Sequence, residues 1–328
     1  MIKVENLTKK YGDKVAVDGL SFTISKGGVH GFLGPNGAGK STTMNIITGC
    51  MTATSGKVFV DGIDVAENPL EAKKKIGYLP EIPPLYDNMT PYEYLVFVAE
   101  AKKVPYDKLY RNVNSVIELT NIEDVSKRLI KNLSKGYRQR IGIAQTMLGN
   151  PDIIVLDEPT VGLDPKQIIE IRKLIQKLGK VKTVIISSHI LSEINELCDD
   201  LLIISHGKMI AHDTIENLEK KLDKTQALSI SVRGQKESVF SALENVNGLA
   251  DCTLTGNKAG IISLKLEHNS DRDIRDDVFS ALADAGCPIL SMEDSSLTLE
   301  DIYLKLTDTE EEKTSNGKKS PRKRGKNK

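Results

Sequence analysis

Cysteine is scarce in this sequence, with four residues in a chain of 328, and the four are widely scattered. They make no C-x-x-C pair, which argues against a thiolate metal site and against a disulfide framework. Buried free thiols in a reducing cytosol are the expectation that remains. The four residues are Cys50, Cys198, Cys252 and Cys287.

Long apolar runs are also missing. The longest, at residues 183–188 and 201–204, fall far short of the ~20 residues that a membrane-spanning helix needs. Residues 1–5 place charges between apolar side chains, so they predict a strand and not a signal peptide. With 39% hydrophobic and 27% charged residues, the chain is expected to be soluble and globular. Any membrane pore would then belong to another polypeptide.

The most informative motif present is G-x-x-x-x-G-K-[ST], placed between an apolar run at 29–33 and a segment of helical periodicity at 41–47. In such a loop the backbone N–H groups turn toward phosphate oxygens, and the following helix N-terminus adds positive potential. Lys40 would reach the terminal phosphates, and the Ser41 hydroxyl would ligate Mg²⁺. A chance glycine-rich turn is the alternative. The residues expected to bind nucleotide here are Gly34, Pro35, Asn36, Gly37, Ala38, Gly39, Lys40, Ser41 and Thr42.

Two adjacent carboxylates, Asp157 and Glu158, follow four apolar residues that predict a strand buried on both faces. Ligands of α/β sheets bind beyond the carboxyl ends of the strands. Successive side chains diverge there, so Asp157 is expected to face Mg²⁺ and Glu158 a water that attacks the γ-phosphate. Solvated acids at a strand end are the alternative, which the phosphate loop makes much weaker.

A third motif, L-S-K-G-Y at residues 133–137, opens a segment of helical periodicity with Ser134 as a natural N-cap. It resembles the L-S-G-G-Q signature of ATP-binding cassette (ABC) ATPases, and the order of all the motifs matches that family over roughly the first two thirds of the chain. The resemblance implies that His189 is the switch histidine, that residues 162–164 form the D-loop, and that Tyr11 stacks on adenine.

The resemblance also implies a mechanism in which two subunits associate head to tail, as a homodimer or as a heterodimer with a similar ATPase. The phosphate loop of one subunit and Ser134 with Gly136 of the other would enclose each ATP, with Mg²⁺ as the metal. Glu158 would act as general base or orient the water, and His189 would bridge Glu158 and the γ-phosphate. A separately encoded integral-membrane permease would dock on a helical subdomain at residues 90–119.

Three positions depart from the common family pattern. Glu81 stands where the family's Q-loop usually has glutamine; its carboxylate can still approach Mg²⁺, but the amide donor is lost. Lys135 and Tyr137 replace the third and fifth signature residues. These variants resemble those of drug-export and ABC-2-type exporter ATPases.

The fold class expected is α/β, a P-loop NTPase of the ABC type with antiparallel β and helical subdomains, in a domain of residues 1–220. Residues 225–307 predict the order β-α-β-β-α-β, which is typical of a small ferredoxin-like α+β domain. Such a fold hosts many functions. A regulatory or dimer-supporting role and a packing appendage without ligand therefore both remain open.

The end of the chain is strongly basic, with eight Lys or Arg and no acid at residues 313–328, so the rest of the chain carries a net charge of −8. The low hydrophobicity predicts a disordered tail at 309–328. A solubilising tail is the simplest interpretation, followed by contact with anionic lipid. Nucleic-acid binding ranks third, because no aromatic residues are interleaved for base stacking.

Three functional classes are open on the sequence alone. The leading one is the ATPase subunit of an exporter, lying in the cytoplasm and peripherally on the cytoplasmic face of the cell membrane. The second is a soluble ABC ATPase acting on ribosomes or DNA, although the second cassette, the coiled-coil insertion and the zinc-binding cysteines of such proteins are missing. The third, a regulator that binds nucleotide without hydrolysis, is disfavoured by Glu158 and His189.

Overall fold

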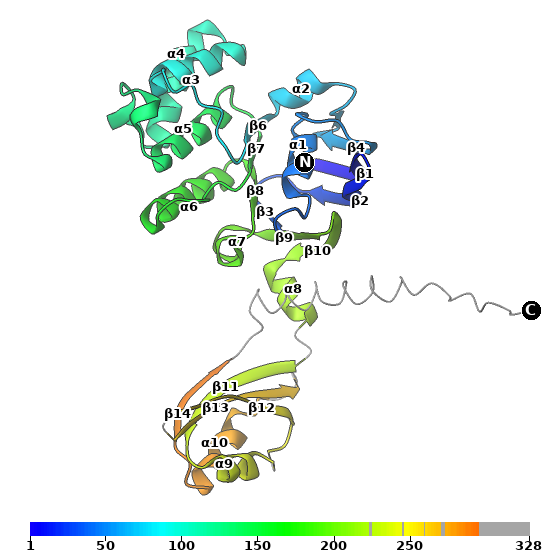
Figure 1. Cartoon of the computed structure of the whole chain (residues 1–328), viewed down its shortest axis with the longest axis vertical. Coiled ribbons are helices and arrows are strands. Elements are labelled where there is room, and N and C mark those ends of the chain that lie inside the picture. Colours follow the sequence, from blue (N-terminus) through cyan, green and yellow to red (C-terminus); the bar gives the residue numbers. More distant parts are fainter. Residues whose placement is uncertain (223–224, 245, 259, 270–272, 295–328) are drawn as a thin grey trace, which may run out of the picture. The chain divides into compact units, whose positions relative to one another are not determined.

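The computed structural model describes residues 1–222, 225–244, 246–258, 260–269 and 273–294 (Figure 1). Contacts divide the chain into two compact units, and the division falls between Thr214 and Ile215. It precedes helix α8 (Ile215–Leu222), whereas the sequence predicted a boundary near residue 220. The basic tail predicted from residue 309 lies outside the described residues.

The first unit contains two sheets and seven α-helices among the described residues. Its elements in chain order are β1 (Ile2–Tyr11), β2 (Lys14–Ile24), β3 (Val29–Leu33), α1 (Lys40–Ile47), β4 (Ser55–Val60), β5 (Ile63–Asp64), α2 (Pro69–Lys74), β6 (Ile76–Leu79), α3 (Pro91–Ala101), α4 (Tyr106–Leu119), the 3₁₀ turns Glu123–Val125 and Ile130–Asn132, α5 (Lys135–Met147), β7 (Ile153–Leu156), α6 (Pro165–Gly179), β8 (Thr183–Ser188), α7 (Leu191–Leu197), β9 (Asp200–Ser205) and β10 (Lys208–Thr214).

The larger sheet has the strand order β10-β9-β3-β8-β7-β6, and all its strands run parallel except β10 at the edge. Every residue of β3, β7 and β8 is buried, as expected for the strands of a parallel sheet covered on both faces. Helices α6 and α7 pack on β3 and β8, and α5 packs on β6 and β7. The apolar runs of these strands therefore form the centre of the unit.

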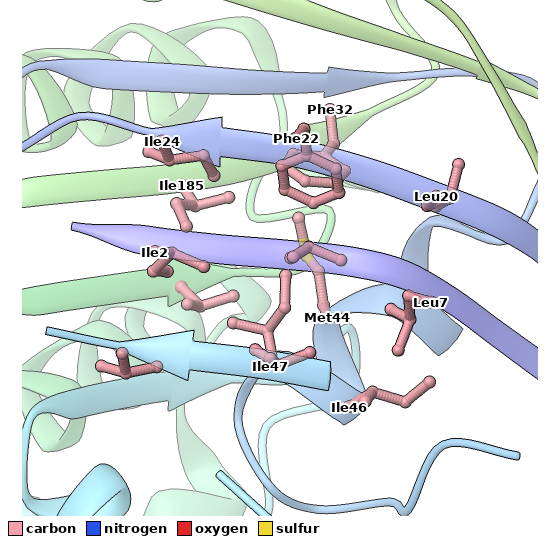
Figure 2. Close-up of a cluster of buried hydrophobic side chains, with 14 of the residues drawn as sticks. Ile2, Leu7, Leu20, Phe22, Ile24, Phe32, Met44, Ile46, Ile47 and Ile185 are labelled. Atoms are coloured by element: carbon pink, nitrogen blue, oxygen red, sulfur yellow. The ribbon is translucent and has the colours of Figure 1, made fainter. Parts of the chain in front are cut away.

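The smaller sheet is antiparallel, with the order β2-β1-β4-β5. Its apolar side chains pack with α1 and with one face of the larger sheet. Figure 2 shows Ile2 and Phe22 of this sheet in one cluster with Met44 and Ile47 of α1, with Phe32 of β3 beside Phe22. The rings of Phe22 and Phe32 lie edge to face, with their centroids 5.4 Å apart. This core fixes the helix that follows the phosphate loop.

Helices α3 and α4 form the helical region predicted at residues 90–119, and α5 packs against both of them. The start of α3 is set by a capping box: Thr90 accepts from the Glu93 backbone N–H, and the Glu93 carboxylate accepts from the Thr90 backbone N–H. Pro91 at the first helical position favours the same start.

The second unit has one antiparallel sheet with the order β12-β13-β11-β14, which is the ferredoxin-like arrangement expected from the sequence. Alternate residues of β11, including Leu228, Ile230 and Val232, are buried in one core with the two helices. After α8, the elements of this unit are β11 (Thr225–Arg233), α9 (Lys236–Leu243), β12 (Leu249–Lys258), β13 (Ile261–Asn269), α10 (Arg275–Asp284) and β14 (Ile289–Asp294).

The four cysteines are free thiols, but the expectation that all are buried is wrong. Cys287 is buried in the core of the second unit, Cys198 and Cys252 are half-buried, and Cys50 is exposed after α1. The wide spacing of the cysteines in the sequence predicted that they form no disulfides, but it carried no information on how deeply each side chain is buried. No helix among the described residues combines the length and the apolar character needed to cross a membrane.

Candidate active site

The residues predicted to act on nucleotide follow the carboxyl ends of neighbouring parallel strands. Leu33, the last residue of β3, pairs with Ser188 of β8, and Leu156 of β7 pairs with Ile186 of β8. The loop that follows β3, the two acids that follow β7 and the histidine that follows β8 therefore meet at one edge of the sheet. This edge is where open α/β sheets bind their ligands.

The phosphate loop needs glycine where its backbone approaches other backbone atoms. A β-carbon at Gly34 would lie 2.2 Å from the Ile204 carbonyl oxygen, and one at Gly39 would lie 2.5 Å from that of Ala16. Gly39 also has φ = +105°, in the region that favours glycine. The tight turn lets α1 begin at Lys40, so that the free N–H groups of its first turn face the loop.

Lys40 is a buried cation in the centre of this loop, with 5% of its side chain exposed. Its Nζ donates to the Gly34 carbonyl oxygen at 2.6 Å and lies 3.4 Å from Glu158 Oε1. Ser41 and Thr42 are half-buried in the first turn of α1, whereas Asn36 and Gly37 are exposed. A fixed ammonium group beside backbone donors is the arrangement that suits a phosphate anion.

Glu158 and His189 are in direct contact. His189 Nδ1 lies 3.0 Å from Glu158 Oε2, while the other carboxylate oxygen faces Lys40. The glutamate is almost completely buried, whereas 40% of the histidine side chain is exposed. Glu158 has φ = +48°, a left-handed conformation that costs free energy for a residue with a β-carbon. One carboxylate thus joins the phosphate loop to the end of β8.

Asp157 lies beside this contact through Ser187, whose importance the sequence interpretation missed. The Ser187 hydroxyl donates to Asp157 Oδ1 at 2.5 Å and accepts from the Glu158 backbone N–H at 2.8 Å. It therefore holds the Asp157 carboxylate and the backbone of Glu158. A hydroxyl at the end of the buried apolar run of β8, two residues before His189, was the signal available in the sequence.

Two of the predicted residues stand apart from this contact network. Tyr11 ends β1 with 46% of its surface exposed, and its hydroxyl donates to Met51 Sδ at 2.9 Å. Glu81 follows β6 and is exposed. Among the described residues no hydrogen bond or ion pair joins either of them to Lys40 or Glu158. Their predicted roles stay predictions.

The signature segment is likewise separate from the phosphate loop in the single chain. Ser134 caps α5, because its Oγ accepts from the Tyr137 backbone N–H at 3.5 Å. Gly136 is buried, and a β-carbon there would lie 2.6 Å from the Gln167 side chain of α6. The Tyr137 hydroxyl donates to Asp124 at 2.6 Å, so this replacement of the family's glutamine points into its own helical subdomain.

The donor set fits a nucleotide with a divalent cation. Mg²⁺ in phosphate-transfer sites is held by one or two protein oxygens together with substrate phosphates. The Ser41 hydroxyl, in the first turn of α1, and the buried Asp157 carboxylate, after β7, are oxygen ligands of this kind. The tyrosine at the end of β6 belongs to the same region: burial raises the pKa of the Tyr78 phenol, and the charge of Asp157 adds to this effect.

Comparison with known proteins agrees with this geometry. The family model described as "ABC transporter" matches residues 17–161. The chain is 32% identical over 311 residues to the linearmycin resistance ATP-binding protein LnrL of Bacillus subtilis (strain 168), covering 94% of this chain and 98% of that protein. It is 39% identical over 233 residues to the bacitracin transport ATP-binding protein BcrA of Bacillus licheniformis, covering 70% and 75% of the two chains.

A solved structure of an ATP-binding cassette is also similar to this chain. The dimeric ATP-binding cassette MJ0796 in a post-hydrolysis state with ADP and Pi has a TM-score of 0.60 and 26% identity, covering 66% of this chain and 99% of that one. The family resemblance inferred from the order of motifs is confirmed. The chain therefore belongs to the ABC transporter family, and it is an ATP-binding and ATP-hydrolysing member of it.

Proposed function

We propose that this chain is the ATPase subunit of an exporter, and that it couples ATP-driven closure and hydrolysis-driven opening of a dimer to a separate membrane permease. The contact of Glu158 with both Lys40 and His189 is the observation that carries the hydrolytic part. The relatives named for bacitracin transport and linearmycin resistance support the export of a compound foreign to the cell.

Each residue of the site has a role that its position supports. Lys40 neutralises the terminal phosphates, because its buried ammonium is held by the loop itself. Glu158 orients the attacking water or accepts its proton. His189 contacts the Glu158 carboxylate through Nδ1, and in our proposal its exposed ring also contacts the γ-phosphate. The exposed side chain of His189 is then covered only when a second subunit closes over the site.

The second half of the site comes from a partner subunit. Ser134 and Gly136 lie at the N-terminus of α5, where four backbone N–H groups lack partners within the helix. Among the described residues no hydrogen bond or ion pair joins them to the phosphate loop of their own chain, and in our proposal they face the nucleotide of another chain. The dimer of MJ0796 supports this arrangement. A homodimer is the simplest form, and a heterodimer with a similar ATPase would use the same surfaces.

Mg²⁺ would be held by Ser41 and Asp157 and would supply charge neutralisation at the phosphates. Glu81 completes our proposed set, with its exposed carboxylate at the end of β6. Tyr11, exposed at the end of β1, is our proposed platform for adenine.

The permease docks on the helical subdomain beside Glu81. Ile82 is 82% exposed, and the exposed rings of Tyr86 and Phe97 lie with centroids 5.4 Å apart. Adjacent exposed apolar side chains of this kind mark surfaces that bind a partner. The protein would accordingly lie in the cytoplasm, held at the membrane by the permease.

Contact of the basic residues 313–328 with anionic lipid would be secondary to permease docking. Flotation of full-length and truncated protein with acidic vesicles over a salt series tests it. We expect weaker and less salt-sensitive association after truncation. Equal flotation of both forms under every condition would leave solubilisation as the role of these residues.

Copurification tests the proposed function as a whole. After gentle detergent extraction of cells, the tagged chain should retain an integral-membrane protein, and ATP turnover should change when that protein is present. A variant with Ile82→Asp and Phe97→Asp should lose the membrane protein and keep its basal ATP turnover. Recovery of ribosomes or DNA in place of a membrane protein would support the soluble ABC ATPase and contradict the exporter.

A further inference from the structure

A buried carboxylate that has no part in the proposed chemistry lies beneath the catalytic edge. Glu193 belongs to α7, and only 3% of its surface is exposed. Its Oε2 accepts from the Thr160 hydroxyl at 2.6 Å and from the Ser188 hydroxyl at 3.1 Å. One oxygen atom thus holds two segments that are distant in the sequence.

These two segments carry the proposed catalytic pair. Thr160 lies two residues after Glu158, in the turn that follows β7, and Ser188 immediately precedes His189 at the end of β8. The Ser188 hydroxyl also accepts from the Ile190 backbone N–H at 3.0 Å. This bond links the residues that precede and follow His189. The hydrogen bonds of Glu193 therefore hold one residue close in sequence to Glu158 and one next to His189.

The negative charge of Glu193 is only weakly offset by a nearby cation. Arg172 Nη2 of α6 lies 3.9 Å from Oε1, and the same arginine forms a short contact with Glu196 on the exposed side of α7. Arg172 Nε is buried without a hydrogen-bond partner. Burying a carboxylate is costly unless it is paired or hydrogen-bonded, and here the two close bonds go to hydroxyl groups of the catalytic loops.

We propose that Glu193 is a positioning residue for ATP hydrolysis. By holding Thr160 and Ser188 on one oxygen, it fixes the relative position of the two loops and so the 3.0 Å contact between His189 Nδ1 and Glu158 Oε2. This inference rests on the roles proposed for Glu158 and His189. A purely structural role in anchoring α7 is the competing explanation, and Glu196 offers the matched control. Glu196 lies on the same helix and pairs with the same arginine, but it has no bond to either catalytic loop.

Steady-state kinetics of the full-length protein separate the two explanations. Glu193→Ala should lower kcat by about 10- to 100-fold, the scale of a misplaced catalytic group, and leave the Kd for ATP unchanged. The kcat of Glu193→Gln should fall less, because the amide oxygen of glutamine can still accept from both hydroxyls. Glu196→Gln should keep the parental kcat. Equal kcat for Glu193→Ala and Glu196→Gln would overturn the inference.

A double-variant cycle with His189→Ala tests whether Glu193 acts through the histidine. If it does, Glu193→Ala should add little to the loss already caused by His189→Ala. Full multiplication of the two losses would contradict a positioning role. Failure of the proposed function gives a different result: His189→Ala would then keep the parental kcat by itself.

Thr160→Val covers the case in which Glu193→Ala does not fold. It removes one hydroxyl while nearly keeping the side-chain volume, so the domain should remain folded by circular dichroism. We expect a reduced kcat with an unchanged Kd for ATP, and a parental kcat would speak against the inference.

Discussion

Single residues in this protein act through what they contact across strand ends. Lys40, Glu158 and His189 come from three separate segments, and each has little chemistry alone. Together they place a cation, a carboxylate and an imidazole in one chain of contacts, with Lys40 and His189 on opposite oxygens of Glu158. Ser187 links the two acidic positions, because its hydroxyl donates to the Asp157 carboxylate and accepts from the backbone N–H of Glu158.

Glu158→Gln should retain ATP binding and lose nearly all turnover, about 10²- to 10⁴-fold, because the amide cannot accept the proton of the attacking water. The change keeps the side-chain size, so nucleotide should then hold two subunits together. Light scattering with and without Mg-ATP measures the dimer. A variant that stays monomeric at saturating ATP would contradict the shared site.

Lys40→Ala and His189→Ala should separate binding from chemistry. The first removes the buried cation that faces the terminal phosphates, so the Kd for ATP should rise steeply. The second leaves the phosphate loop intact, so its Kd should stay near the parental value while kcat falls by about 10²-fold or more. Calorimetric titration with ATP and a turnover assay measure the two quantities. An equal rise in Kd for both variants is the result that would refute these roles.

At the scale of elements, an ion pair joins the beginnings of strands β3 and β9, at the end of the large sheet that lies opposite the nucleotide site. His30 of β3 has Nδ1 2.7 Å from Asp200 Oδ1 of β9 and Nε2 2.8 Å from the Gly27 carbonyl oxygen. Both partners are acceptors, so the imidazole binds both only when it is protonated on both nitrogens. Burial lowers the pKa of His30, but the hydrogen bond and charge of Asp200 outweigh it and the pKa is raised.

The same contacts act on the carboxylate. Burial raises the pKa of Asp200, but the hydrogen bonds from His212 and His30 outweigh it and bring the pKa to about 2. The charged groups that face His30 are thus Asp200 and the neighbouring Asp199, and His212 of β10 faces Asp200 from the other side.

The stabilisation by this pair should depend on pH. A raised His30 pKa contributes free energy of unfolding that is fully present below pH 6.5, the unfolded value, and is lost as pH rises through the folded value. The lowered pKa of Asp200 adds a second contribution to the free energy of unfolding. This contribution is fully present above pH 3.8, the unfolded value, and is lost as pH falls through about 2. Urea unfolding of parent and His30→Gln, followed by circular dichroism, should therefore differ most near pH 5 and less near pH 9. A constant difference would show that the pair is not ionised as described.

The whole molecule consists of two units with separate hydrophobic cores. The core of the first includes residues from Ile2 to Ile204, and that of the second includes residues from Leu228 to Cys287. No residue belongs to both clusters. The complete set of proposed catalytic residues lies in the first unit.

A chain of residues 1–214 should therefore fold and bind ATP without the second unit. We expect cooperative thermal unfolding and a Kd for ATP close to that of the full-length protein, because the phosphate loop and its supporting core are intact. Calorimetry of both chains measures this. Loss of cooperative unfolding would show that the second unit is needed for the first to fold.

Much of the fold was predictable from local patterns, because they act over a few residues. Glycines at the phosphate loop, apolar runs before the acids and the cap at Ser134 each constrain nearby backbone. The β-α-β-β-α-β order of the second unit followed from periodicity in the same way. Family resemblance added the histidine, for which a single residue carries no local signal.

What the sequence by itself determined was therefore the chemistry and type of each segment: the phosphate loop, the acid pair and the elements around them. Only the tertiary structure placed β8 between β3 and β7, and with it Ser187 between the two acids and Glu193 beneath Thr160 and Ser188. It also turned the Tyr137 ring toward Asp124. The contact of Ser187 with Glu158 joins residues 29 positions apart, and that of Thr160 with Glu193 joins residues 33 positions apart. Such contacts and the strand order depend on how buried surfaces pack, which no local pattern specifies.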